Sequence, residues 1–227
     1  MRFKLTALAA TAALAALVFS AVAVGGKRDS HAQHAQHAQH AQQAQVTAGD
    51  LRVLLDRQLG QHAALAMNAT NAGVTGSKDF AAAAKALDRN SVALSKTIAS
   101  VYGATAGNTF LNGKFMWRAH ITFFVDYTKA LAKNNKAAQT RAVANLKTYT
   151  VKFGDFLATA TELPKPAVRN DLLAHVLELK GQLDAYAHHN YGKAASLYDN
   201  AYNHMFMTGD LLAGAIAKQY PNRFPKG

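Results

Sequence analysis

The sequence contains no cysteine. This absence excludes disulfide bonds, thiolate metal sites, a thiol nucleophile and a lipid-modified cysteine after a signal sequence. Exported proteins without cysteine are common in Gram-positive bacteria, which do not depend on disulfides for every secreted fold. If the chain is exported, its lack of cysteine therefore favours a Gram-positive source.

Acidic residues are also few, with 13 Asp and Glu against 25 Lys and Arg, and the only glutamates are Glu162 and Glu178. A carboxylate-bridged di-iron bundle needs Glu-x-x-His pairs, which this chain lacks. The chain also lacks a Gly-x-Ser-x-Gly elbow, a phosphate-binding loop and a His-Glu-x-x-His motif. Because no catalytic constellation is visible, we expect a protein that is not an enzyme.

The formal net charge is +12, and the basic residues are spread along the chain. No basic run is interleaved with aromatic residues, so nucleic acid is not an expected partner. Anionic cell-wall polymers or a membrane surface are the partners that such a charge favours.

Residues 1–25 have the pattern of a secretion signal. Arg2 and Lys4 precede an uncharged run rich in Ala, Leu and Val, and Ala21-Val22-Ala23 offers a small-x-small cleavage site. The run is also long enough to cross a bilayer if it stays uncleaved, so an N-terminal anchor is the alternative. In both cases we expect the rest of the chain outside the cytoplasm, secreted or attached to the cell envelope.

Residues 26–46 are rich in His, Ala and Gln and lack the large apolar residues that could offset chain entropy by burial. The composition predicts a flexible linker. Spaced neutral imidazoles also chelate copper, nickel or zinc, so the repeat is either an incidental linker or a collector of metal ions. Its candidate ligands are His31, His34, His37 and His40.

Residues 47–227 predict one all-α domain, an antiparallel bundle of about six long helices. Apolar residues recur at helical spacing, and no stretch shows the alternation that is typical of strands. Thr47 and Asp50 favour a helix start, whereas Gly103, Pro164 and Pro221 favour helix ends. The expected helices extend from residue 47 to a loop at 71–77, from 78 to 102, from about 116 to 134, from 137 to 161, from about 166 to 190, and from 192 to 220.

The most aromatic stretch, residues 116–127, is a predicted core helix in which His120 shares the apolar face with Phe124 and Tyr127. A buried imidazole needs a hydrogen bond, a metal or a cofactor to offset its desolvation. Histidines occupy comparable positions elsewhere. They lie on the apolar faces of four predicted helices, and they are His62, His120, His175 and His204.

An internal repeat connects these histidines. His62, His120 and His175 recur about 55 to 60 residues apart, each on the first helix of a predicted helical hairpin. Asn90, Tyr149 and His204 stand at matched positions of the second helices. We interpret the folded part as three tandem hairpins with polar residues at equivalent interior positions.

The four histidines either make separate structural hydrogen bonds or share a metal site. Copper is the favoured metal, and zinc or haem are the alternatives. The thioethers of Met205 and Met207 next to His204 either add soft ligands that suit Cu(I) or, as methionines more often do, fill gaps in the core. Asp126 and Asp184 either orient the imidazoles as hydrogen-bond acceptors or face solvent.

Three strings carry a resemblance that covers about Leu51 to Phe224: LLDRQLGQHAALA, MWRAHITFFVDYTKALA and AYNHMFMTGDLLAGAIAKQYPNRF. They resemble secreted helical proteins of Bacillus- and Paenibacillus-type bacteria that are catalogued as copper amine oxidase-like. The resemblance implies copper. It does not imply amine oxidation, because Asn190-Tyr191 is followed by Gly192, not by the acidic residue of a quinone-forming motif, and no His-x-His motif is present.

The sequence thus favours an exported, non-enzymatic helical bundle that binds copper through core histidines, with the histidine tail as a weaker collector. The first alternative is a structural or interaction module of the cell envelope without a cofactor. A haem carrier is the second, because Phe, Tyr and His in a helical core suit a porphyrin.

Overall fold

The computed structural model describes residues 45–226 of the chain. The predicted signal or anchor at 1–25 and most of the linker at 26–46, including His31, His34, His37 and His40, lie outside these residues. The described part contains helices and no strand, which confirms the all-α prediction. The helices are α2 (Ala48–Thr75), α3 (Phe80–Tyr102), α4 (Ala104–Asn112), α5 (Trp117–Ala132), α6 (Lys136–Thr161), α7 (Lys165–Ala187) and α8 (Tyr191–Gln219).

The end of the first helix differs from the sequence expectation. Helix α2 continues into the loop expected at 71–77 and ends at Thr75, followed by its C-cap Gly76, which adopts φ 68 in the left-handed region that favours glycine. Gly73 is helical and lies inside α2, where neighbouring side chains leave no room for a Cβ. A Cβ there would lie 2.9 Å from the side chain of Thr128 and 3.0 Å from that of Phe80. The glycine that looked like a loop signal is therefore a position of close helix packing.

The short helix α4 was not predicted. Gly103 does end α3, but the chain resumes a helix at the next residue and folds back on the end of α3. Gly107 allows this contact, since a Cβ there would lie 2.6 Å from the Cβ of Ala99, and the Ser95 hydroxyl donates to the Gly107 carbonyl at 2.9 Å. Helix α4 lies between the first and second of the three predicted hairpins.

The helix starts follow ordinary capping chemistry. Thr47 and Asp50 form a reciprocal capping box at α2, and the side chains of Asn135 and Asn190 accept hydrogen bonds from the first turns of α6 and α8. The two ends of the described part are joined, because the backbone N–H of Ala48 donates to the carbonyl of Pro225 at 2.9 Å.

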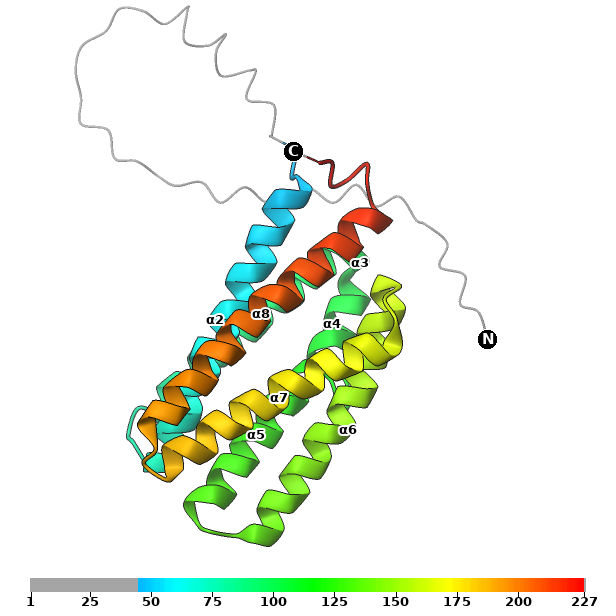
Figure 1. Cartoon of the computed structure of the whole chain (residues 1–227). Coiled ribbons are helices and arrows are strands. Elements are labelled where there is room, and N and C mark those ends of the chain that lie inside the picture. Colours follow the sequence, from blue (N-terminus) through cyan, green and yellow to red (C-terminus); the bar gives the residue numbers. More distant parts are fainter. Residues whose placement is uncertain (1–44, 227) are drawn as a thin grey trace, which may run out of the picture. The chain divides into compact units, whose positions relative to one another are not determined.

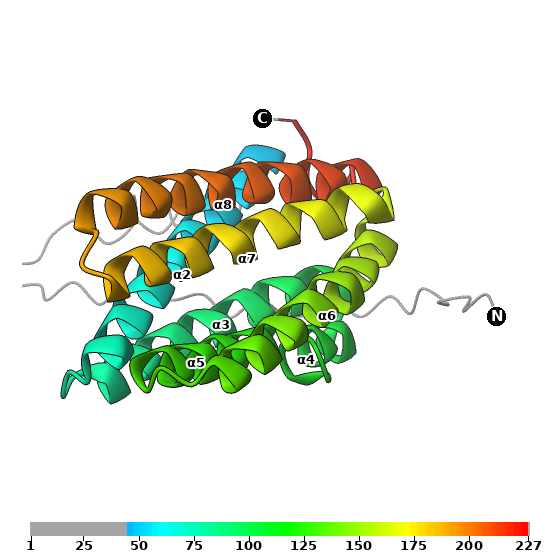
Figure 2. The same ribbon diagram turned by 60° about the horizontal axis from the view of Figure 1, so that its bottom comes forward.

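The hairpins α2/α3, α5/α6 and α7/α8 pack so that their first helices meet. Helix α2 contacts α3, α5, α7 and α8, and α5 also contacts α7. Figure 1 shows α2 and α8 side by side, and Figure 2 shows α7 and α8 on one side of the bundle with α3, α5 and α6 on the other. The first helices of the hairpins, which carry His62, His120 and His175, therefore meet in the interior.

The core is formed by leucine, alanine and aromatic side chains from all the hairpins, and Leu55, Leu146, Phe153 and Leu183 have no exposed surface. None of the helices in residues 45–226 combines the length and the apolar character that a membrane span needs.

Two glycines of α8 allow a direct test of the α2–α8 contact. A Cβ at Gly209 would lie 2.2 Å from Oδ1 of Asp56 and 3.1 Å from its backbone nitrogen, whereas a Cβ at Gly214 would meet nothing within 4 Å. We expect Gly209→Ala to lower the free energy of unfolding by about 1–3 kcal/mol through overpacking. Gly214→Ala should raise it by up to about 1 kcal/mol, because alanine is the better helix former.

Urea denaturation of both variants beside the parent chain measures the two changes. Equal effects of the two substitutions would contradict the close approach of α8 to α2.

Candidate functional site

Three imidazoles meet where α2, α5 and α7 contact one another. The ring of His62 lies with its centroid 5.3 Å from that of His120 and 6.1 Å from that of His175. All three side chains are buried, with exposed fractions of 1%, 2% and 5%. We call His62, His120 and His175 the histidine core. The helical hairpins thus bring together residues that are far apart in the sequence.

The nitrogens of the histidine core have almost no hydrogen-bond partners. The only polar contact is between Nε2 of His62 and Nε2 of His120, which lie 3.4 Å apart. Within the described residues, Nδ1 of His62, Nδ1 of His120 and both ring nitrogens of His175 have no partner. A buried polar group without a partner costs about 1–3 kcal/mol, so this arrangement calls for a physical reason.

Aromatic rings enclose the core. Trp117 packs against His62 and His120 at centroid distances of 4.7 and 4.9 Å, and its Nε1–H donates to the Ser91 hydroxyl at 3.1 Å. Tyr149 stacks on His120 at 4.7 Å with an interplanar angle of 28°. These rings cover much of the imidazole surface with aromatic carbon.

Burial keeps the core imidazoles neutral. Desolvation, followed by the charge that His120 would carry, lowers the pKa of His62 well below 6.5. Desolvation, followed by His175, lowers the pKa of His120 to about 3. Desolvation, followed by His62 and His204, lowers the pKa of His175 well below 6.5. All three rings therefore present lone pairs at neutral pH.

His204 on α8 lies at the edge of this cluster in a different environment. Its ring centroid is 6.0 Å from that of His175, with the ring planes at 83°. Its Nδ1 lies 2.9 Å from Glu178 Oε2 and its Nε2 lies 3.1 Å from Asp171 Oδ1. Because ionised carboxylates only accept hydrogen bonds, both ring nitrogens donate and the ring is an imidazolium. The hydrogen bond to Asp171, with a smaller contribution from Glu178, raises the pKa of His204 to about 9 despite burial.

The repeat noticed in the sequence has a structural counterpart. Each matched residue of a second helix contacts the first helix of its own hairpin near the histidine. Tyr149 stacks on His120, and His204 meets His175 edge to face. Asn90 donates to the carbonyl of Gln58 at 2.9 Å and to Gln61, the neighbour of His62, at 3.0 Å.

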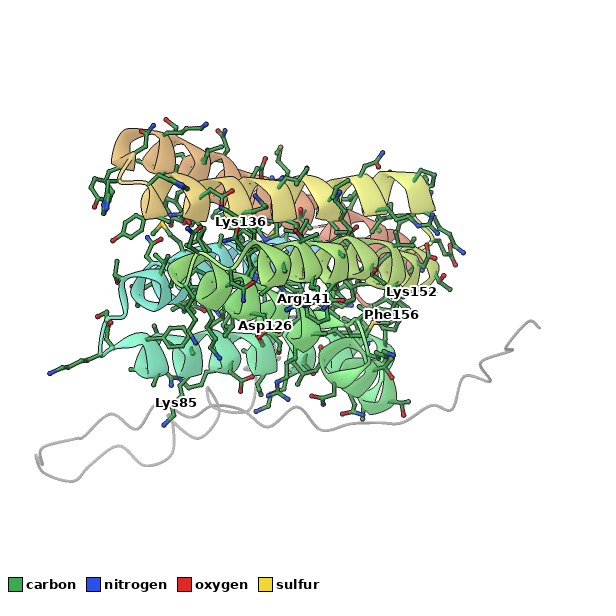
Figure 3. The ribbon with its side chains drawn as sticks, turned by 90° about the horizontal axis from the view of Figure 1, so that it is seen from below. Lys85, Asp126, Lys136, Arg141, Lys152 and Phe156 are labelled. Carbon is green, nitrogen blue, oxygen red and sulfur yellow. The ribbon has the colours of Figure 1, made fainter. Side chains whose placement is uncertain are left out.

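The other predicted site residues lie apart from the histidine core. Met205 is buried among apolar side chains, and Met207 is 62% exposed at the surface. The carboxylate of Asp184 accepts hydrogen bonds from Tyr127 and Lys180, and the imidazole that contacts Asp184 is the exposed His188, which bonds its backbone carbonyl at 2.7 Å. Asp126 lines a surface pocket with Lys129 and Arg141. Figure 3 labels Asp126 and Arg141 among the side chains near α6.

The carboxylates that do bond a core-facing histidine, Asp171 and Glu178, are absent from the sequence prediction. The helical spacing of the sequence could have identified them. Asp171 stands four residues before His175 and Glu178 three residues after it, so all three lie on one face of α7. Thr208 completes this group by donating to Asp171 Oδ2 at 3.1 Å.

A small cavity of about 30 Å³ adjoins His62 and His120. Its other walls are apolar apart from Thr70, whose hydroxyl donates within its own helix. Within residues 45–226, no group of three or more His, Asp or Glu side chains is already arranged to coordinate a metal ion. The His62–His120 pair is thus the closest approach of candidate metal ligands within the histidine core.

The searches for related proteins return no match: no protein-family model, curated protein or solved structure aligns with this chain.

The opposite pKa shifts predict a stability maximum near neutral pH in the metal-free protein. Below pH 6.5 the unfolded chain binds protons at His62, His120 and His175 that the folded core does not bind. Stability should therefore fall as the pH drops, by up to about 4 kcal/mol per pH unit for three protons. Above pH 6.5 the stabilising charge on His204 is lost progressively as the pH rises through about 9.

Urea denaturation with a chelator present, at intervals between pH 4.5 and 9.5, measures this profile. His175→Leu should reduce the acid slope by about a third, since one of three protons is removed. His204→Gln should abolish the part of the alkaline decline that is due to His204. A stability that is constant from pH 4.5 to 6.5 would contradict the neutral core.

Proposed function

We propose that this protein is an exported helical bundle that holds a transition-metal ion, copper by preference, at His62, His120 and His175, and that it acts as a carrier or store. One observation carries the proposal: two buried Nε2 atoms lie 3.4 Å apart, and four further nitrogens of the same three rings have no partner. Buried imidazoles that are neutral and unpartnered have the protonation state that a metal ligand needs.

The separation of the two Nε2 atoms supports metal binding. Two nitrogens at about 2.0–2.1 Å from a tetrahedral ion lie roughly 3.3–3.4 Å apart. His62 and His120 already have this spacing. His175 would supply the third donor by turning its ring toward the pair, since its centroid is 6.1 Å from that of His62 and neither of its nitrogens is engaged.

Copper is favoured over zinc for two reasons. At a site of given nitrogen donors, Cu²⁺ binds more strongly than the other divalent first-row ions. Because Cu²⁺ prefers tetragonal geometry, binding it would draw the two Nε2 atoms from 3.4 Å to roughly 2.8–2.9 Å apart. The resemblance to copper amine oxidase-like proteins points to the same metal. The tail histidines His31, His34, His37 and His40 would collect metal with lower affinity, because the composition of their segment predicts a flexible linker.

The surroundings of the histidine core favour storage over turnover. The cavity beside His62 and His120 measures about 30 Å³. Organic substrates and porphyrins need a pocket roughly ten times larger, which disfavours both amine oxidation and haem binding.

A second candidate is an interaction module of the cell envelope without a cofactor. The observation that favours it is an open surface pocket of about 340 Å³ between α5 and α6, which is lined by Lys129, Lys133 and Arg141. Asp126 is the only acidic residue of its lining. Such a surface suits an anionic wall polymer.

Trp117 provides the test of the metal site, since it is the only tryptophan and its ring lies 4.7 Å from that of His62. The chain to use carries glutamine at positions 31, 34, 37 and 40, so that the tail cannot bind. We expect Cu²⁺ to quench Trp117 fluorescence saturably at one ion per chain. His175→Leu should weaken this binding at least about tenfold while leaving the metal-free stability at pH 7 unchanged or higher, because it removes unpartnered polar atoms.

The matched control is the variant His188→Gln, His189→Gln, which removes two exposed imidazoles and should bind copper like the parent. Failure of Cu²⁺ to quench Trp117, or equal binding by His175→Leu, would overturn the proposed site. Absence of any stoichiometric metal would favour the envelope module.

A further inference from the structure

A hydrated cation must pass from solvent to the buried histidine core, and the charge of the chain opposes its approach. The formal net charge is +12, so the protein as a whole repels a metal ion. Uptake at a useful rate needs a local negative surface next to the imidazoles. Within the described residues, Asp171 and Glu178 are the only carboxylates that hydrogen-bond any of the four core-facing histidines.

The geometry of α7 places this acidic pair beside a core ligand. Asp171, His175 and Glu178 stand at positions i, i+4 and i+7 of one helix and therefore share a face. The side chains of Asp171 and Glu178 are 21% and 26% exposed, whereas His175 is 5% exposed. One face of α7 thus leads from solvent-accessible carboxylates to a buried imidazole.

We propose that Asp171, Glu178 and His204 form an acquisition site, in which the two carboxylates capture a divalent transition-metal cation and pass it to His175. This inference rests on the proposed metal-binding function. Capture and final binding are separate events here, because the carboxylates lie at the surface and the histidine core lies inside.

Two contacts indicate how the acquisition site works. His204 hydrogen-bonds both carboxylates at once, through Nδ1 and Nε2, and its ring also lies against that of His175. Thr208 fixes Asp171 by a hydrogen bond to its second oxygen. An arriving cation replaces His204 on the carboxylates, and the His204 ring, which lies edge to face with that of His175, then moves aside. The two unpartnered nitrogens of His175 are the next donors available to the ion.

The test separates the rate of uptake from the extent of binding. Aqueous Cu²⁺ is mixed with the full chain that carries glutamine at the four tail histidines, and Trp117 quenching is followed by stopped flow. Asp171→Asn with Glu178→Gln should slow uptake at least about tenfold, the lower end of the range for electrostatic steering, at an unchanged copper stoichiometry. The matched control Asp184→Asn removes a carboxylate of 31% exposure from the same helix, and it should leave the rate unchanged.

A charge-preserving variant, Asp171→Glu with Glu178→Asp, guards against misfolding of the amide variant and should keep the parent rate. An unchanged rate in the amide variant, or a charge-preserving variant as slow as the amide variant, would overturn the acquisition site. Loss of equilibrium binding in the amide variant would also overturn it, because the carboxylates would then be ligands of the final site. If the parent chain itself binds no copper, the proposed function fails first, and that outcome is distinct from all of these.

Discussion

The burial of three neutral imidazoles with almost no hydrogen-bond partners is the constraint on which the rest of the bundle depends. Charging any of His62, His120 or His175 is opposed by desolvation, and each unpartnered nitrogen costs stability. Apolar and aromatic packing around Trp117 and Phe153 must supply the compensating free energy. A ligand that bound these nitrogens would restore part of the lost stability. For this reason the core favours a metal-binding interpretation.

Helical repetition explains how one short region gathers histidines from distant parts of the chain. Each hairpin places its histidine on the first helix, and α2, α5 and α7 contact one another inside the bundle. The second helices set the local chemistry. Tyr149 covers His120 by stacking, whereas α8 brings His204 against His175 and the carboxylates of α7. The bundle therefore holds imidazoles in two protonation states about 6 Å apart, neutral where apolar packing surrounds them and charged where carboxylates do.

Much of the fold was accessible from sequence because long amphipathic helices leave a strong periodic signal. Helix α4 leaves no such periodic signal, because it has only nine residues. Gly107 within it and Gly103 and Gly113 beside it also predict turns from the sequence. Periodicity placed His62 and His120 on apolar faces but could not show that these faces meet, since convergence is set by helix packing across the hairpins. Asp171 and Glu178 were missed for a related reason: an acidic residue on a helix is usually solvated, and only the approach of His204 from α8 gives this pair a role.

X-ray absorption at the copper edge, on the copper-loaded chain with glutamine at positions 31, 34, 37 and 40, tests the metal centre most directly. If the histidine core holds the ion, the spectrum should show about three imidazole nitrogens near 2.0 Å with the outer-shell scattering of histidine rings and no sulfur. The same chain with His62→Leu and His120→Leu should lose this signature. A sulfur shell, or an unchanged spectrum in the double variant, would contradict a metal centre built from His62, His120 and His175.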